Sequence, residues 1–202
     1  MRAMTLLETL GAALGLSTLA GINLYLTVLV AGLAVRFHWI ELSSEYGDLA
    51  VLGNPWILGI AGTLFAVQFF ADKVPWVDSV WDSVHTIIRP AGAILIALAV
   101  LGNMEPTVQV GAALLAGTAS LSTHSVKAGV RAFLNLLPEP VSNSVASVTE
   151  DGVVLGGLGL IGLAPGVALF VFILVVILCT ALGIWLWKRI FRMKQRLTAQ
   201  AA

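Results

Sequence analysis

The sequence predicts an all-α, polytopic helical membrane protein, and two observations lead to this class. Of the 202 residues, 58% are hydrophobic and only 11% are charged, whereas an ordinary soluble domain has roughly 25% charged residues. The hydrophobic residues also gather into long apolar runs, separated by short segments rich in Gly, Pro or charge, which is typical of membrane-spanning helices. We therefore expect residues 1–202 to form a single transmembrane domain of about six helices.

Three crossings are expected in the first half of the chain. The apolar runs cover about residues 6–35, 55–70 and 90–101. The last run is shorter than the ~20 residues that a hydrocarbon core requires, unless the polar helix before it lengthens it. Within the first run, Asn23 and Tyr25 interrupt the apolar sequence, which indicates either a polar break in the helix or a hydrogen bond to a neighbouring helix.

Three further crossings are expected in the second half. The fourth covers about residues 108–134, and the apolar stretch after Asp151 divides at the Gly-Leu-Ala-Pro-Gly sequence of residues 162–166. This division leaves a short fifth helix and a long sixth helix that ends near Trp187. Because several spans are short, broken or re-entrant half-helices are the alternative to complete crossings.

Charge at the ends of the chain predicts the orientation in the membrane. Residues 188–202 form a basic tail, and Arg2 lies at the other end of the chain. Since basic residues favour the cytoplasmic side, both termini are expected there. The net charge of zero argues against nucleic acid as a partner. The lone Cys179 allows neither a disulfide framework nor a thiolate metal site, no cofactor is expected, and a metal is left unknown.

The most informative segment is residues 72–90, DKVPWVDSVWDSVHTIIRP. Four of its ionisable residues, spaced i, i+4, i+7 and i+11, fall on one face of a helix. These four are Asp78, Asp82, His85 and Arg89, and Asp72 and Lys73 precede them. The polar face points either into a cavity or partner helix, or into water and headgroups at the membrane surface, where Trp76 and Trp81 would fit an interfacial belt.

The fourth span carries a second polar stripe, because five of its residues also share one helical face. They are Ser120, His124, Lys127, Arg131 and Asn135. Basic groups within a membrane need partners or must extend toward the interface. The acidic residues expected to meet them are Asp78, Asp82, Glu139, Glu150 and Asp151.

Two short matches indicate an internal repeat with halves at residues 1–104 and 105–190. Residues 17–20 match residues 119–122, and residues 77–86 match residues 141–150, which include Asn143. If each half holds three crossings, the two copies are inverted relative to each other in the membrane, as in many secondary transporters.

Four strings in the chain resemble those of an uncharacterised bacterial membrane family, domain of unknown function 4126. The strings are GINLY at residues 21–25, DKVPWVDSVWDSVHTIIRPAGA at 72–93, STHSVKAGVRAFLN at 122–135 and PEPVSNSVASVTED at 138–151. The resemblance covers nearly the whole chain and implies a polytopic inner-membrane protein. It transfers no activity.

Three classes of function remain open from the sequence. The first is a small transporter or channel for an ion, a small anion or a lipid phosphate; the others are a non-catalytic membrane assembly protein and, with less support, a membrane-embedded enzyme. Expected partners are membrane lipids and a small solute or ion, and a homodimer is left open. The candidate binding residues are Asn23, Asp72, Lys73, Asp78, Asp82, His85, Arg89, Ser120, His124, Lys127, Arg131, Asn135, Glu139, Asn143, Glu150 and Asp151.

Overall fold

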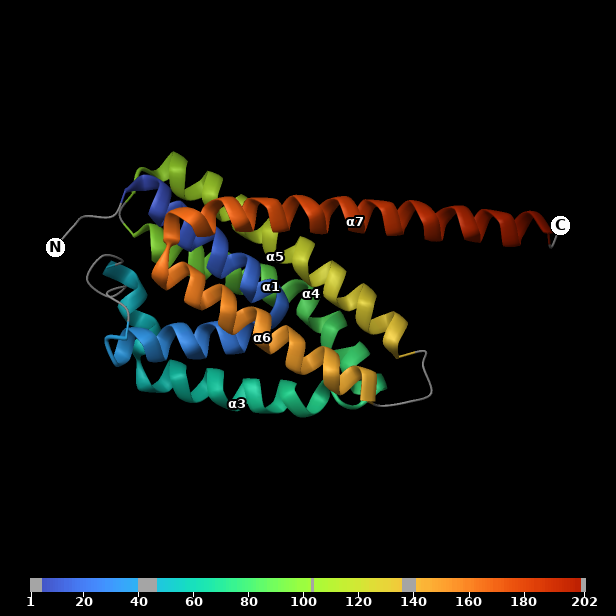
Figure 1. The fold of residues 1–202 in the computed structure, drawn as a ribbon, viewed down its shortest axis with the longest axis horizontal. Coiled ribbons are helices and arrows are strands. Elements are labelled where there is room, and N and C mark those ends of the chain that lie inside the picture. The colour runs from blue at the N-terminus through green and yellow to red at the C-terminus, as the bar shows by residue number, and fades with distance from the viewer. Residues whose placement is uncertain (1–4, 40–46, 103, 136–140, 201–202) are drawn as a thin grey trace.

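The computed structural model describes residues 5–39, 47–102, 104–135 and 141–200, and these residues form helices joined by short connections (Figure 1). The elements are α1 (Leu6–Arg36), the 3-10 helix η1 (Gly47–Gly53), α3 (Pro55–Ala71), α4 (Pro75–Leu101), α5 (Pro106–Leu134), α6 (Val141–Leu163) and α7 (Pro165–Gln200). The predicted all-α membrane fold is therefore confirmed.

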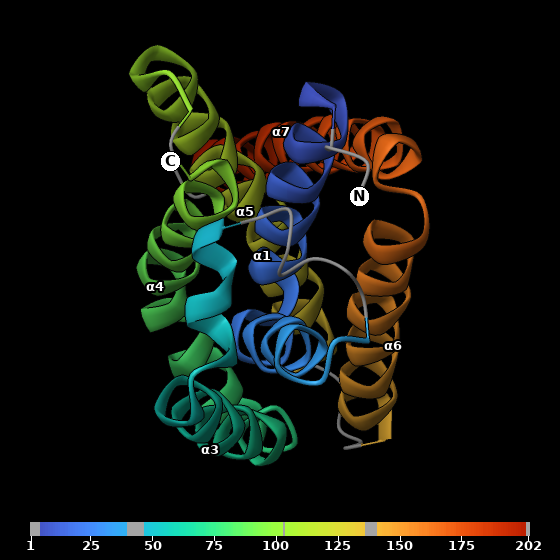
Figure 2. The ribbon, with the colours of Figure 1, turned by 90° about the vertical axis from the view of Figure 1, so that its left-hand side faces the viewer.

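Helix α1 is not a straight crossing but a re-entrant hairpin. At Asn23 the backbone leaves the helical region, with φ −147° and ψ 96°. The first half of α1 runs from one end of the bundle to its middle, and the second half returns to the same end (Figure 1). Seen from that end, the second half points at the viewer (Figure 2). The apolar run predicted over residues 6–35 forms α1, and the predicted polar break at Asn23 is confirmed.

Local sequence explains where the helices begin. Pro55, Pro75, Pro106 and Pro165 each start a helix, the position where the missing N–H costs nothing and the fixed φ is already helical. The Thr5 and Glu8 side chains form a capping box at the start of α1. The division predicted at residues 162–166 is found between α6 and α7.

One predicted alternative is confirmed and one predicted boundary needs correction. The charged segment lengthens the third span into one continuous helix, α4, which contains Pro90. The fifth helix begins at Val141 instead of after Asp151, so it includes the segment that matches residues 77–86. By length and apolar character, α1, α4, α6 and α7 qualify as membrane spans, and α3 is a shorter apolar helix. Helix α5 does not qualify, since polar residues occupy one face.

The two ends of the described chain lie at opposite ends of the bundle. Helix α1 starts and finishes at the end that lies on the left of Figure 1, and α3 to α7 then alternate in direction, so α7 finishes at the opposite end. The two ends of α1 lie at the same end of the bundle because α1 doubles back. The prediction that both termini are cytoplasmic stays a prediction. Residues 188–200 continue α7 as a helix.

The matched segments lie in parallel, not inverted, helices. The first half of α1 runs in the same direction as α5, and α4 runs in the same direction as α6 (Figure 1). The two glycines before the first match have equivalent surroundings: a Cβ on Gly15 would meet Ile161 of α6, and one on Gly117 would meet Ile94 of α4. The inverted arrangement is not confirmed, and a duplication stays a prediction.

The first half of α1 forms the centre of the bundle. It is in contact with α4, α5, α6 and α7, and residues such as Leu16 and Leu19 are buried. Glycines allow the close approach: a Cβ on Gly11 would lie 2.2 Å from the Pro165 carbonyl oxygen, and one on Gly157 would lie 2.6 Å from Leu19. This packing places the tip of the hairpin among the polar faces of three other helices.

Candidate functional site

The break at Asn23 leaves the first half of α1 with carbonyl groups that no longer have helical donors. Basic side chains from two other helices bond to them. Arg89 Nη1 of α4 donates to the Gly21 carbonyl at 3.0 Å, and Lys127 Nζ of α5 donates to the Ile22 carbonyl at 3.2 Å. Positive charge at this position also stabilises the negative end of the helix dipole.

Asn23 begins the second half of α1 and links it to α6. Its Oδ1 accepts a hydrogen bond from the Leu26 N–H at 3.1 Å, the bond that an N-cap side chain makes. Its Nδ2 donates to Asp151 Oδ1 at 2.9 Å. One side chain therefore caps one half-helix and joins the tip of the hairpin to a carboxylate of α6.

Arg131 and Lys127 of α5 share two carboxylates. Arg131 Nε and Nη2 donate to the two oxygens of Glu150 at 3.0 and 2.8 Å, a bidentate pair that fixes the guanidinium plane. Lys127 Nζ lies 3.1 Å from Glu150 Oε2. Asp72 Oδ2 lies 3.6 Å from Arg131 and 3.9 Å from Lys127. Two positive and two negative charges thus balance in this part of the site.

Asp72 lies between α3 and α4, outside the spanning helices, and is 2% exposed. Burial raises the pKa of its carboxyl group, and the nearby charges of Lys127 and Arg131 oppose that rise. Burial acts in this direction because a low-dielectric surrounding disfavours the charged form.

Arg89 pairs with Asp82 and orients His124. Arg89 Nη2 lies 3.5 Å from Asp82 Oδ1, and Nη1 also donates to His124 Nδ1 at 3.0 Å. Since guanidinium groups only donate, Nδ1 must be unprotonated. The proton of this imidazole then lies on Nε2, which donates to the Asp82 carbonyl at 3.0 Å. The network assigns His124 as a neutral imidazole.

His85 is held in the opposite tautomer. Its Nδ1 lies 2.7 Å from the Trp81 carbonyl oxygen, which only accepts, so the ring proton is on Nδ1. Its Nε2 accepts from the Tyr25 hydroxyl at 2.9 Å. Tyr25, from the second half of α1, therefore connects the hairpin to α4.

Asp78 is bound by amides. Its Oδ2 accepts from Asn135 Nδ2 at 3.0 Å, and Asn135 Oδ1 accepts from Asn143 Nδ2 at 2.6 Å. The Asn143 carbonyl accepts from Arg131 Nη1 at 3.0 Å. Asp78 is fully buried, and no basic side chain forms an ion pair with it in the part of the chain that the structure describes.

A cavity of about 260 Å³ lies between α4 and α5. Its lining consists of Asp78, Ser79, Asp82, Ser83, Thr86, Ala128, Arg131 and Ala132. Three buried carboxylate oxygens of these residues, Asp78 Oδ1 and both oxygens of Asp82, have no hydrogen-bond partner among the described residues. The cavity thus contains acceptors for which the described chain supplies no donor.

Most of the predicted residues meet around the tip of the hairpin. The polar residues that share one face of α4 or α5 are buried. Asp78, Arg89, Ser120 and Arg131 are each at most 1% exposed. The hydrophobic face of α4 is outside, as Ile87 at 77% exposed shows. The polar face of α4 therefore points into the bundle and not onto the membrane surface.

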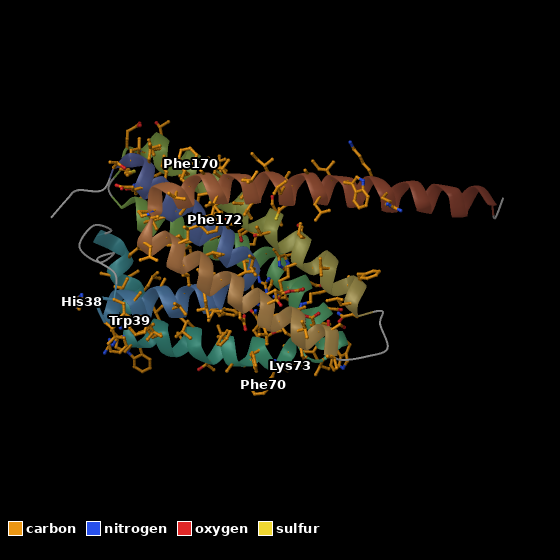
Figure 3. The ribbon with its side chains drawn as sticks, viewed as in Figure 1. His38, Trp39, Phe70, Lys73, Phe170 and Phe172 are labelled. Carbon is orange, nitrogen blue, oxygen red and sulfur yellow. The ribbon has the colours of Figure 1, made fainter. Side chains whose placement is uncertain are left out.

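Among the described residues, Lys73 and Ser120 were predicted but do not join the network; the buried Ser120 hydroxyl has no hydrogen-bond partner there. Lys73 donates to the Phe69 carbonyl at 2.8 Å and lies over the Phe69 ring, near Phe70 at the end of α3 (Figure 3). Glu139 lies outside the described residues.

Three residues of the site were not among the predicted ones. Tyr25 and Thr86 bond to the two histidines, and Gln68 is fully buried one turn before Asp72. The sequence signal for Gln68 was a lone amide in an otherwise apolar helix. Among the described residues, no three His, Cys, Asp or Glu side chains are placed to hold a metal ion.

The fold and site define a helical integral membrane protein in which the broken tip of a re-entrant hairpin is enclosed by buried charges. The family described as "Domain of unknown function (DUF4126)" matches residues 10–189. The chain belongs to this family, as the four strings in the sequence indicated. Neither a curated protein nor a solved structure matches the chain.

Proposed function

We propose that the protein moves protons or a small cation across the membrane, as a transporter or channel. The observation that carries the proposal is the helix break at Asn23, which lies inside the bundle among ionisable side chains from α4, α5 and α6. Non-helical backbone within a membrane is tolerated where it is enclosed by protein or lines a cavity. Broken helices of this kind form the ion and substrate sites of many transporters.

The charges favour a cation over an anion or a lipid phosphate. Each of the three buried basic groups has an internal contact: Arg89 with Gly21 and His124, Lys127 with Ile22, and Arg131 with Glu150. Arg89 Nε and Nη2 have no hydrogen-bond partner among the described residues, but Nη2 lies 3.5 Å from Asp82 Oδ1, so an anion bound there would also meet the Asp82 carboxylate. The carboxylate oxygens of Asp82 likewise have no hydrogen-bond donor among the described residues.

The proposal includes a location and an orientation. We place the protein in the bacterial cytoplasmic membrane, with lipids against the exposed apolar faces of α3, α4 and α7. The end of α7 carries Lys188 and Arg189, whereas Glu8 and Glu105 lie where α1 and α5 begin, at the opposite end. Because basic residues favour the cytoplasm, the end of α7 is inside and the start of α1 outside.

Sealed liposomes provide the test. Purified protein is reconstituted with an internal pH dye, and a proton or Na⁺ gradient is applied with valinomycin and K⁺ to clamp the potential. We expect flux well above protein-free liposomes, and a loss of at least about tenfold in Asp82→Asn, since a tenfold change corresponds to about 1.4 kcal/mol in a barrier. Glu105→Gln, an exposed acid outside the network, should retain the flux.

The same experiment decides against transport if the wild-type protein moves neither ion. Elution as a single species in size-exclusion chromatography shows that each variant is folded before its flux is compared. A folded wild-type protein without flux would favour a non-catalytic assembly role, in which the buried charges only hold the helices together.

A further inference from the structure

We infer that the cavity between α4 and α5 binds one monovalent cation, coordinated by the carboxylates of Asp78 and Asp82. This inference rests on the proposed function and names its site. The supporting observations are the charge balance of the buried network and the oxygen atoms that line the cavity.

Among the described residues of the network, the charge balance leaves one fully buried carboxylate without a basic partner. Lys127 and Arg131 balance Glu150 and Asp72, and Arg89 balances Asp82. Two carboxylates of this described network remain, Asp78 and Asp151. They differ in surroundings, because Asp151 is partly exposed whereas Asp78 is fully buried.

A buried ionised carboxylate without a counter-charge is strongly unfavourable. The amide of Asn135 reaches only one oxygen of Asp78, Oδ2, and leaves Oδ1 without a hydrogen-bond partner among the described residues. A single positive charge in the adjoining cavity would remove this cost.

The lining of the cavity is suited to a hard cation, which prefers oxygen ligands. Asp78 Oδ1 and the two oxygens of Asp82 are buried and lack hydrogen-bond donors in the described structure. Ser79, Ser83 and Thr86 add hydroxyl groups to the same wall. They recur on the face of α4 that carries Asp82, since residues three to four positions apart share one face of a helix.

The size of the cavity indicates that the ion keeps part of its water shell. A volume of about 260 Å³ holds several water molecules, each of which occupies about 30 Å³ in the liquid. Water molecules would complete the coordination shell of the ion, because the protein supplies oxygen ligands mainly from one side of the cavity.

The positive groups around the cavity limit the charge of the ion. Arg131 lies in the lining, and Arg89 lies 3.5 Å from Asp82. Both would repel a divalent ion more strongly than a monovalent one, and only Asp78 lacks a counter-charge. No group of three acidic or histidine ligands is present among the described residues, so the usual ligand set of a divalent metal is missing there.

The test uses the full-length protein in lipid nanodiscs and measures thermal unfolding and ²²Na⁺ binding. NaCl, KCl or choline chloride is titrated at constant ionic strength and pH. A ligand that binds only the folded state raises its stability with concentration. We expect a saturable rise in Tm and saturable binding with Na⁺ or K⁺, and neither with choline, an organic cation that is not a hard metal ion and does not take carboxylate oxygens as ligands.

Two variants separate the site from general effects of charge. Asp78→Asn should abolish the cation-dependent rise in Tm, whereas Glu105→Gln, which removes an exposed carboxylate outside the network, should keep it. If Asp78→Asn does not fold, Thr86→Val replaces one hydroxyl of the lining without a change of charge, and should weaken cation binding by at least about threefold.

Three results would overturn the inference. The first is the same Tm and binding with Na⁺, K⁺ and choline, and the second is the same cation dependence in Asp78→Asn as in the wild type. The third is a rise in Tm with acid alone, which would make Asp78 a protonation site. The proposed function fails separately. Saturable binding without flux in liposomes would leave the cation site in place and remove transport, whereas flux without binding would remove only the site.

Discussion

Arg89 Nη1 is 3.0 Å from the carbonyl oxygen of Gly21, a residue 68 positions away in the sequence. The guanidinium is fully buried, and it closes the end of a half-helix that Asn23 interrupts. One contact therefore joins the charged face of α4 to the re-entrant hairpin. The contact explains why a bundle with such an apolar exterior keeps an arginine inside: the guanidinium donates a hydrogen bond to a carbonyl group that the helix break leaves without a helical donor.

Replacement of Arg89 is expected to destabilise the protein strongly. Arg89→Met leaves the Gly21 carbonyl without this donor and Asp82 without its counter-charge, and loss of one partner of a buried ion pair costs about 3–5 kcal/mol. Unfolding in a detergent micelle, followed by circular dichroism, measures the change. Arg189→Met, at an exposed position of α7, should stay within about 0.5 kcal/mol of the wild type. Equal effects of the two variants would contradict this role of Arg89.

The pair of Arg131 and Glu150 should show strong coupling in a double-mutant cycle. Arg131→Gln leaves Glu150 with Lys127 alone, and Glu150→Gln leaves Arg131 with the more distant Asp72. We expect the double variant to be less destabilised than the sum of the two single variants, by about 0.5–3 kcal/mol. The free energies of unfolding of the four proteins give this value, and strictly additive effects would show that the bidentate contact contributes little.

Two glycines provide a matched test of the crossing between α1 and α5. A Cβ on Gly21 would lie 2.0 Å from Thr123 Oγ1 and 2.3 Å from the Ser120 carbonyl oxygen, whereas nothing lies within 4 Å of a Cβ on Gly152. Gly21→Ala should lower Tm, because the backbone of α5 has to move.

Gly152→Ala should leave the stability unchanged or raise it by up to about 1 kcal/mol, since alanine favours a helix. Thermal unfolding of the two variants in the same detergent compares them directly. A similar Tm for both would argue that α1 and α5 do not cross closely at Gly21.

The orientation of the protein is open to a labelling experiment. In a Cys179→Ala background, single cysteines are placed at Trp39, exposed just after α1, and at Lys188, exposed on α7. A maleimide that cannot cross the membrane is added to spheroplasts before and after lysis. We expect Trp39→Cys to react in intact spheroplasts and Lys188→Cys only after lysis. Reaction of both before lysis would place the two ends on one side and contradict the re-entrant form of α1.

The site was partly predictable because helical spacing determines which residues share a face. The spacing of Asp82 and Arg89 placed them together on α4, and that of Lys127 and Arg131 placed them together on α5; the structure buries both faces. Lys73 shows the limit of this reasoning. It belongs to the same charged segment, but it precedes the helix, so spacing said nothing about its direction, and it turns to Phe69.

The hydrophobic composition by itself determined that this is a helical membrane protein, because composition decides whether a chain is soluble in lipid. The prolines at positions 55, 75, 106 and 165 marked where helices begin, because the fixed φ of proline is a local property of the backbone. Only the tertiary structure decided that α1 turns back at Asn23, that the matched segments are parallel, and that the two ends of the chain lie apart. A polar residue in an apolar run is compatible with either a kink in a helix or a reversal of the chain direction. Arg89 and Lys127, which are distant in the sequence, supply the donors that make the reversal stable.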